Sequence, residues 1–450
     1  PMNLARRLLA PLLAAVALVV TAAPSVPAPD TSGWSWQPMY FSGVASPSVS
    51  VGNDEVRVLK VVGDDLYVGG SFTGFAGGVD RNRIARWNSV DGEWHDLGGS
   101  EASGAITSGT VLSIEVSGNY VYVGGDFTIT DASAEVHHNF AYFDLVSQEW
   151  HGFDGATTGD LFLNGEVRTI FADENTGALY VGGSFTNAYD NDNADYLVVG
   201  SFSGCVGVVG ACVTETPHVS VCGGVSVSCA ITVPNRWDAV GDDGAGGPAL
   251  SGFVSSITRL ASGSLLISGN FGNAGGTVGA NSITRLTYTD RYTWASEVIP
   301  SVSMYPLAMH ESTAYVGGWE DVYQRDLTGS WLPICYAGLH RPGGKWDAVE
   351  PVSRSLVFAG SSAGLLACNP ETGGSSVFYS SGWIVDIARF HDDLIVAGSS
   401  NLGELGSVGD YIAIVRGVDF TDLPATDADR RSTTERAILL VSLAALTAIA

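Results

Sequence analysis

A seven-residue phrase that occurs three times is the feature that most constrains how this chain can fold. Residues 67–73 read YVGGSFT, residues 122–128 read YVGGDFT and residues 180–186 read YVGGSFT, so the phrase returns after 55 and then 58 residues. Repetition at this period indicates stacked structural units. Paired glycines suit close backbone approach and a phenylalanine suits the space between units, so we assign a structural role to Gly69, Gly70, Phe72, Gly124, Gly125, Phe127, Gly182, Gly183 and Phe185.

Each copy lies within a larger unit of four short strands. Around the first copy, apolar runs at residues 58–62, 84–87 and 93–98 are separated by turn residues, a pattern that predicts antiparallel strands. Weaker copies of the phrase follow at residues 266–271, 315–319, 357–361 and 395–399. Four antiparallel strands per unit of about 40–50 residues predict an all-β fold, a β-propeller of about seven four-stranded blades over residues 50–418.

The composition agrees with short strands and tight turns. The chain of 450 residues contains 57 glycines and only 15% charged residues, which is typical of strands joined by turns. Its formal net charge of −26 repels phosphate backbones, so nucleic acid is not an expected partner. The acidic surface identifies no ligand by itself, because it also serves solubility.

The N-terminal segment has the order of a secretory signal peptide. Arg6 and Arg7 precede an apolar run at residues 8–20, which is followed by small residues and prolines. This arrangement predicts a signal peptide over residues 1–28. Residues 29–49 are interpreted as a linker or first-strand region.

The C-terminal segment is apolar and uncharged over residues 437–450, after a linker at residues 419–436. Ser432 and Glu435 have the spacing of a capping box, which predicts a helix that begins there. Two interpretations remain open, because a spanning helix needs about 20 residues. The run is either the start of a truncated transmembrane anchor or the short hydrophobic tail of a sorting or lipid-anchor signal.

The six cysteines are interpreted as disulfide candidates. An even number in a secreted chain favours disulfides, and the spacing of the first four is wider than that of a zinc site. These four lie in a Val/Ser/Gly-rich insertion at residues 203–232. The candidates are Cys205, Cys212, Cys222, Cys229, Cys335 and Cys368.

Chemistry-bearing motifs are few. Asp190, Asp192 and Asp195 alternate with other residues as the ligands of a calcium loop do, but the Gly and distal Glu of an EF-hand are missing, so calcium competes with a plain acidic loop. His137 and His138 are interpreted as a surface pair. No other cofactor is expected and no catalytic residue is assigned, because the sequence lacks the nucleophile-elbow, zincin, P-loop and dinucleotide motifs.

The first unit resembles a known repeat. Residues 66–73, 82–87 and 94–98 together look like the secreted delta-60 repeats of kelch-like β-propellers, and are similar to the ectodomain of the fungal cortical cell-polarity marker (Rax-type) family. The resemblance is good over residues 50–190 and thin after residue 270. It implies a signal peptide, an extracellular propeller and one C-terminal membrane anchor. The chain departs from that family in being short and in having no Asn-x-Ser/Thr acceptor.

Two functions remain open. The first is a non-catalytic propeller at the cell surface, single-pass anchored with the propeller outside, that binds a protein or glycan through rim loops and acts as a scaffold or polarity marker. The second is a secreted propeller hydrolase or oxidoreductase that acts on glycans with acids or histidines in its axial funnel. Fold alone supports both. Three or more converging carboxylates or histidines at the funnel would favour the enzyme. Functional residues are expected in the non-repeating loops and in the cysteine-bearing insertion.

Overall fold

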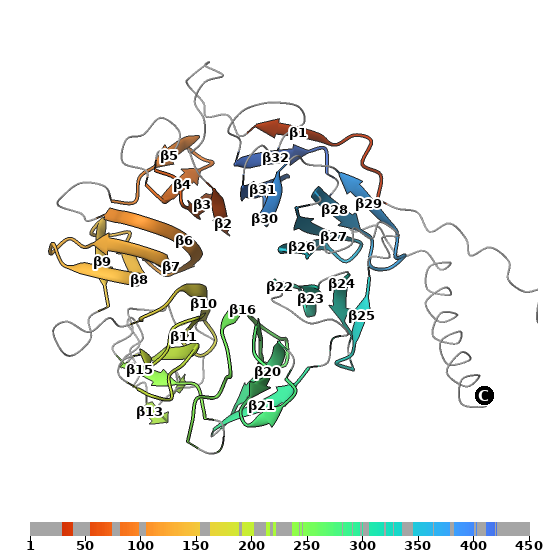
Figure 1. Cartoon of the computed structure of the whole chain (residues 1–450). Helices are drawn as coiled ribbons and strands as arrows, with labels where there is room; N and C mark the ends of the chain where they lie inside the picture. Colours follow the sequence, from red (N-terminus) through yellow and green to blue (C-terminus); the bar gives the residue numbers. More distant parts are fainter. Residues whose placement is uncertain are drawn as a thin grey trace, which may run out of the picture.

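The computed structural model is a ring of seven four-stranded antiparallel sheets, arranged as the blades of a β-propeller (Figure 1). The expectation of an all-β propeller with about seven blades is therefore confirmed. The structure describes residues 29–38, 55–73, 82–98, 105–153, 163–188, 191–201, 213–216, 219–221, 236–242, 244, 246–280, 282–289, 291–297, 299, 306–318, 321–326, 328–334, 345–362, 364–378, 382–399, 402, 411–418 and 420.

Each blade runs outward from an innermost strand that faces the axis of the ring (Figure 1). Blades one to three are β2 (Val56–Val62), β3 (Asp65–Gly70), β4 (Ile84–Asn88), β5 (Glu93–His95); β6 (Ala105–Ser117), β7 (Tyr120–Thr130), β8 (Val136–Asp144), β9 (Glu149–Gly152); and β10 (Val167–Asp173), β11 (Ala178–Gly183), β12 (Leu197–Ser201), β15 (Arg236–Ala239). Blades four to six are β16 (Val254–Arg259), β17 (Leu265–Gly269), β20 (Ile283–Tyr288), β21 (Tyr292–Ser296); β22 (Leu307–His310), β23 (Thr313–Gly317), β24 (Val322–Arg325), β25 (Trp331–Pro333); and β26 (Ala348–Ser353), β27 (Leu356–Ser361), β28 (Gly364–Cys368), β29 (Ser375–Phe378). Blade seven is β30 (Trp383–Phe390), β31 (Asp393–Ser399), β32 (Ile412–Arg416) and β1 (Ser35–Pro38).

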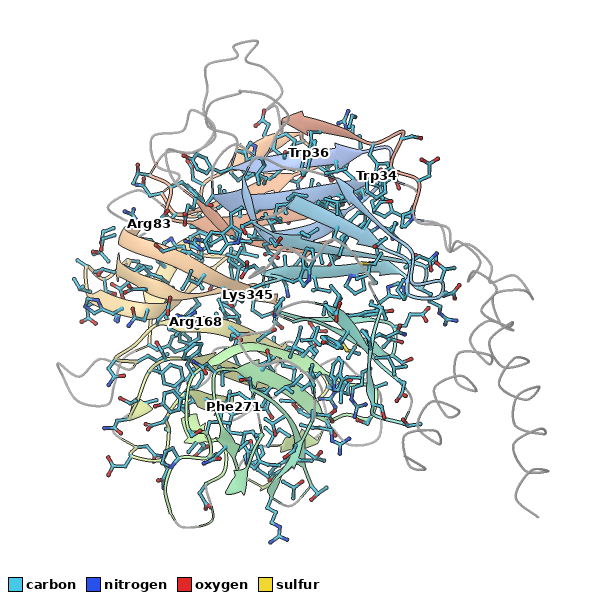
Figure 2. All side chains as sticks on the ribbon, turned by 45° about the vertical axis from the view of Figure 1, so that its right-hand side comes forward. Trp34, Trp36, Arg83, Arg168, Phe271 and Lys345 are labelled. Atoms are coloured by element: carbon cyan, nitrogen blue, oxygen red, sulfur yellow. The ribbon has the colours of Figure 1, made fainter. Side chains whose placement is uncertain are left out.

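Blade seven joins the two ends of the ring. Its outermost strand is β1, from the segment interpreted as a linker or first-strand region, and β1 pairs with β32 from Ser35↔Arg416 to Pro38↔Ala413. Trp34 packs against Phe358 of blade six, with ring centroids 5.4 Å apart, and Figure 2 shows Trp34 and Trp36 at this edge. Because one sheet contains strands from both ends of the repeat region, the ring opens only if backbone hydrogen bonds break.

Two short hairpins interrupt the regular blades. β13 (Val213–Thr216) pairs with β14 (Val219–Val221) inside the cysteine-bearing insertion, between the third and fourth strands of blade three. β18 (Asn273–Ala274) pairs with β19 (Thr277–Val278) in blade four.

The two glycines of the phrase serve different contacts. The first faces the next blade, where a Cβ at Gly124 would lie 2.3 Å from Cγ1 of Val167. The second faces its own blade, where a Cβ at Gly125 would lie 2.1 Å from the carbonyl oxygen of Thr110. Either Cβ would force its neighbours to move, because real Cβ atoms do not approach so closely. The two glycines of the phrase are thus required by close packing, the first between blades and the second within a blade.

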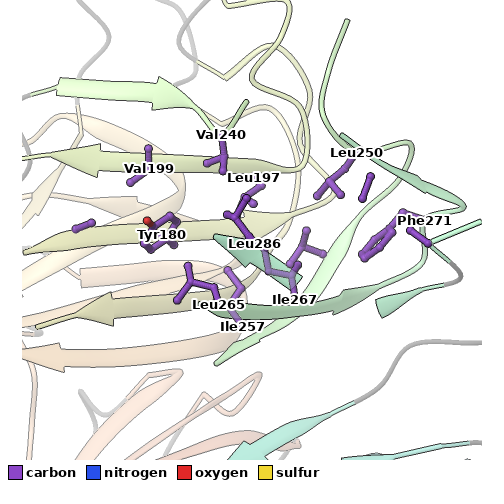
Figure 3. Packing of buried hydrophobic residues seen from close by; sticks show 14 residues of the cluster. Tyr180, Leu197, Val199, Val240, Leu250, Ile257, Leu265, Ile267, Phe271 and Leu286 are labelled. Carbon is purple, nitrogen blue, oxygen red and sulfur yellow. The ribbon is translucent and has the colours of Figure 1, made fainter. Parts of the chain in front are cut away.

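The core consists of layers between adjacent blades. Figure 3 shows one layer, in which Tyr180 and Val199 of blade three pack against Ile257, Leu265 and Ile267 of blade four. The phenylalanines of the three phrase copies are all buried. Burial of such layers is the main favourable term in the folding of the ring.

No helix among the described residues is long and apolar enough to cross a membrane. The expected signal peptide at residues 1–28 and the apolar segment at residues 437–450 lie outside the described residues.

We expect Gly124→Ala to lower the free energy of unfolding by about 1–3 kcal/mol, because the added methyl overpacks the contact with Val167 of the next blade. Urea unfolding followed by tryptophan fluorescence measures the change. Gly33→Ala is the matched control, because no atom lies within 4 Å of a Cβ at that position. Equal stability of the two variants would contradict the assigned role of the first glycine.

Candidate functional site

A bulge at the start of the innermost strands gives β2 and β10 one extra residue each. The register shifts between Val56 and Val58 in β2 and between Val167 and Thr169 in β10. The extra residues are Arg57 and Arg168. Bulges turn a side chain away from the regular alternation of a strand, so both arginines leave the pattern of the blade core at equivalent places.

The two arginines have the same surroundings. Arg57 forms an ion pair with Glu55, and Arg168 forms one with Glu166. Each guanidinium also lies over an aromatic ring of an adjacent blade: Arg57 Cζ is 5.8 Å from the centroid of Trp383, and Arg168 Cζ is 4.7 Å from that of Phe253. Such contacts add cation–π attraction to the ion pair. We call these six residues the axial rim: Glu55, Arg57, Glu166, Arg168, Phe253 and Trp383.

The axial rim retains hydrogen-bonding capacity. The Nε atoms of Arg57 and Arg168 are buried and have no hydrogen-bond partner among the described residues, although buried polar atoms are nearly always paired. About a third of each arginine side chain is exposed. Figure 2 shows Arg168 toward the middle of the molecule.

Trp383 adds a fixed aromatic face to the rim. Its side chain is large and 39% exposed, and its indole Nε1 donates to Asp347 Oδ2 at 2.8 Å. Asp347 is itself paired with Lys345 Nζ at 2.7 Å. An indole held by a hydrogen bond offers a rigid apolar surface at small entropic cost. Because each rim charge is paired with its opposite, the rim offers donors, acceptors and aromatic faces without net charge.

Other polar groups of the innermost strands link neighbouring blades. Asp386 Oδ2 of blade seven accepts from the Leu59 N–H of blade one at 2.7 Å. Ser113 of blade two accepts in the same way from the Ile170 N–H of blade three at 2.9 Å. These bonds satisfy N–H groups that an edge strand leaves unpaired.

Burial shifts the pKa of three carboxyls on the innermost strands. It raises the pKa of Asp386 to about 7 and that of Glu350 to about 8. It also raises the pKa of Glu115, against the opposing effect of Lys60, whose Nζ lies 2.7 Å from Glu115 Oε1. Glu350 accepts from the Arg389 N–H of blade seven at 3.4 Å. All three carboxyls therefore bond to a neighbouring blade.

The residues expected to bind calcium are placed only in part. Asp190 lies outside the described residues, Asp192 is exposed, and Asp195 Oδ1 accepts from the Asn187 N–H at 2.7 Å. Calcium binding by these aspartates stays a prediction. Cys368 is buried in β28, and the other five cysteines lie outside the described residues, so their pairing also stays a prediction.

His137 and His138 do not form the surface pair expected from the sequence. His137 turns inward, and its side chain is only 9% exposed, whereas His138 Nδ1 lies 3.2 Å from Thr128 Oγ1. Among the described residues, the group of three metal-capable side chains that converge is Asp131, Glu135 and His137. It lies at the β7–β8 turn and not at the axis.

Sequence reasoning missed the axial rim. The tripeptide Glu-Val-Arg occurs at residues 55–57 and again at residues 166–168. Its glutamate precedes the first glycine of the phrase by 14 residues in the first copy and by 16 in the second. This recurrence is visible in the sequence. Its meaning depends on the bulge, which strand alternation does not reveal.

Comparison with known proteins supports the repeat. Residues 108–142, within β6, β7 and β8, match the family model described as LVIVD repeat. No curated protein matches the chain. The matched region is a small part of the chain, so it identifies a repeat type rather than a family for the whole protein.

Solved propellers resemble the whole ring. The extracellular domain of a putative hybrid two-component system from B. thetaiotaomicron is 13% identical, with a TM-score of 0.51 over 84% of this chain and 41% of that one. The WD40 β-propeller domain of Doa1 is 13% identical, with a TM-score of 0.47 over 86% of this chain and 98% of that one. The chain thus spans less than half of the first structure, and likeness at this identity shows the fold. This chain is therefore a β-propeller repeat protein, a class compatible with binding or scaffold roles.

We expect stability to fall as pH rises from about 4 to 7, in part because of Asp386. Its carboxyl stays protonated in the folded protein up to about pH 7, while the unfolded chain ionises near pH 4. The stabilising contribution is therefore complete below pH 4 and is lost as pH rises through 7. Asp386→Asn should flatten this dependence in urea unfolding between pH 4 and 8. Asp392→Asn, an exposed control, should retain the wild-type slope. An unchanged slope for Asp386→Asn contradicts the assignment.

Proposed function

We propose that this chain is a non-catalytic cell-surface β-propeller that binds an uncharged glycan at the axial rim. The observation that carries the proposal is the exposed indole face of Trp383, fixed by Asp347, beside the Arg57–Glu55 pair. Sugar rings offer C–H faces that pack on aromatic rings, and hydroxyls that both donate and accept hydrogen bonds. The guanidinium groups supply the matching donors and the carboxylates supply the matching acceptors.

Electrostatics favours an uncharged ligand. The formal net charge of −26 repels polyanions, and the rim arginines are each neutralised by a glutamate. The negative electrostatic potential of the protein does not repel a neutral glycan. Its binding should therefore depend little on ionic strength.

The carboxyls near the axis support binding over catalysis. An enzyme of the alternative class needs acids or histidines that converge on a substrate. Glu115, Glu350 and Asp386 have raised pKa values, but each bonds to an adjacent blade. These three carboxyls therefore link neighbouring blades of the ring. The paired residues of the axial rim remain as the groups available to a ligand.

A glycan also fits the rim better than a protein partner does. Large interfaces have a contiguous apolar centre. The exposed large hydrophobic residues of the described part are scattered over different blades and turns, and only the last of them belongs to the rim: Val62, Val90, Val136, Val146, Leu332 and Trp383.

The proposed location is outside the cell. The apolar N-terminal segment has the pattern of a signal peptide, and the similar structure from B. thetaiotaomicron is described as an extracellular domain. We place the propeller outside, with residues 437–450 as part of a single-pass anchor. A role as a polarity or surface marker, as in the Rax-type family that the first unit resembles, is part of this proposal.

We expect Trp383→Ala to weaken binding of neutral oligosaccharides by about tenfold or more, because it removes the stacking face of the rim. The measurement is calorimetric titration with cello-, manno- and chito-oligosaccharides, at low and high salt. Leu332→Ala is the matched control, since it truncates an exposed apolar side chain on the outer strand β25.

The binding proposal fails if none of these sugars binds, or if Trp383→Ala binds as tightly as Leu332→Ala. Binding of an acidic peptide that is lost in high salt would instead favour a protein partner.

We expect reductant to lower the melting temperature of the secreted chain, because the cysteines of the insertion at residues 203–232 are proposed to form disulfides that limit the unfolded state. Scanning calorimetry with and without reductant measures the effect. Equal melting temperatures would show that these cysteines do not stabilise the fold.

A further inference from the structure

Among the strands that the structure describes, β6 and β7 of blade two are the longest. They have 13 and 11 residues, whereas the innermost strands β2 and β10 have seven each. The additional pairing joins β6 to β7 from Ala105↔Thr130 to Thr110↔Asp126. It also joins β7 to β8 from Thr128↔His138 to Thr130↔Val136.

The turn at the tip of the β7–β8 hairpin is held in one conformation. Asp131 N–H donates to Glu135 O at 2.9 Å, and Asp131 Oδ1 accepts from the N–H groups of Ser133 and Glu135 at 2.8 and 2.9 Å. Ala132 N–H donates to Trp150 O of β9 at 3.1 Å, so the turn folds back against its own blade. One oxygen of Asp131 is thereby fixed by the turn, while the other, Oδ2, faces His137.

The blade leaves space for the His137 imidazole. A Cβ at Gly152 would lie 2.0 Å from Cγ of His137 and 2.2 Å from its Nδ1, so only glycine at position 152 admits the ring there. In blade one the residue at the corresponding place after the tryptophan and histidine is Asp96. The repeat is therefore altered where the imidazole lies, and this alteration is independent of the acidic residues around it.

Three ligand atoms converge at the tip. His137 Nε2 lies 3.1 Å from Asp131 Oδ2, and the ligand atoms of Asp131, Glu135 and His137 all lie within 4.8 Å of one another. Ligands of a tetrahedral zinc ion stand roughly 3.3 Å apart, as bond lengths of about 2.0–2.2 Å require. The Asp131–His137 separation is already close to that value. Glu135 is exposed, so its side chain is free to move the remaining distance.

We propose that Asp131, Glu135 and His137 form a binding site for a divalent transition metal of the zinc type. One imidazole nitrogen with two carboxylates suits Zn²⁺ or Co²⁺, whereas calcium prefers oxygen ligands alone. Three protein ligands leave a coordination position for water or for a group from a partner. Metal binding replaces the contact between His137 Nε2 and Asp131 Oδ2, because both atoms become ligands.

The test is calorimetric titration of the chelator-treated full chain with ZnCl₂, with CoCl₂ as a spectroscopic probe and CaCl₂ as a comparison. We expect saturable binding of Zn²⁺ and a visible Co²⁺ absorption band. His137→Gln should weaken Zn²⁺ binding by about tenfold or more. His138→Gln is the matched control, because His138 contacts Thr128 instead, and it should bind as the wild type does.

Glu135→Gln keeps the test decisive if His137→Gln fails to fold, since Glu135 is exposed and its loss does not disturb the core. It should weaken Zn²⁺ binding while leaving the melting temperature of the metal-free chain unchanged. Absence of Zn²⁺ binding by the wild-type chain overturns the proposal, as does wild-type affinity in Glu135→Gln or in folded His137→Gln. None of these outcomes bears on glycan binding at the axial rim.

Discussion

The contact between the first glycine of one blade and the innermost strand of the next is the constraint on which the ring depends. A Cβ at Gly69 would lie 2.6 Å from Val111 Cγ1, and one at Gly182 would lie 2.7 Å from Val254 Cγ1. In blade six, where the phrase has faded, a Cβ at Gly360 would still lie 2.2 Å from Ile384 Cγ2. The sheets approach this closely because each has an apolar face on both sides, and only a ring covers all of those faces. Blade six therefore keeps this glycine after the rest of the phrase has changed, whereas the small residues Ser268 and Ala397 take its place in blades four and seven.

Polar links accompany this packing at every blade boundary, and their chemistry differs from one boundary to the next. Four are ion pairs between side chains and three join a side chain to a backbone N–H, so each boundary has a polar link without keeping one residue type. From the first boundary to the seventh, the links are Lys60–Glu115, Ser113–Ile170, Asp173–Arg259, Glu297–Arg325, Glu311–Arg354, Glu350–Arg389 and Asp386–Leu59. The buried links stabilise the ring more than the exposed Glu311–Arg354 pair does, because solvent screens exposed charges.

The fold was predictable to the extent that packing repeats in the sequence. The phrase, the turns and the closing tryptophan strand define the blades, because alternation and glycine spacing are local properties. The pairing of β1 with β32 was not predictable, since residues 35–38 carry no copy of the phrase and their partner lies at the other end of the repeat region. The polar links between blades could not be predicted from the sequence either, because Asp386 and Ser113 occupy equivalent positions in their blades but are different residue types. His137 was misjudged since its burial depends on Gly152, which is distant in sequence.

The axial rim lies at repeated backbone positions, whereas the sequence led us to expect functional residues in the non-repeating loops. The second glycine admits the backbone carbonyl of its own blade, with a Cβ at Gly70 placed 2.0 Å from Glu55 O and one at Gly183 placed 2.0 Å from Glu166 O. The bulge that results recurs in five blades, and its extra residue is Arg57, Leu112, Arg168, Ser255 or Val385. Backbone packing fixes where this residue lies but does not restrict its chemistry. A repeat can thus keep its architecture while it varies a ring of side chains near the axis. In this chain two of those positions hold arginines that lie over the aromatic rings of Trp383, which is exposed, and Phe253.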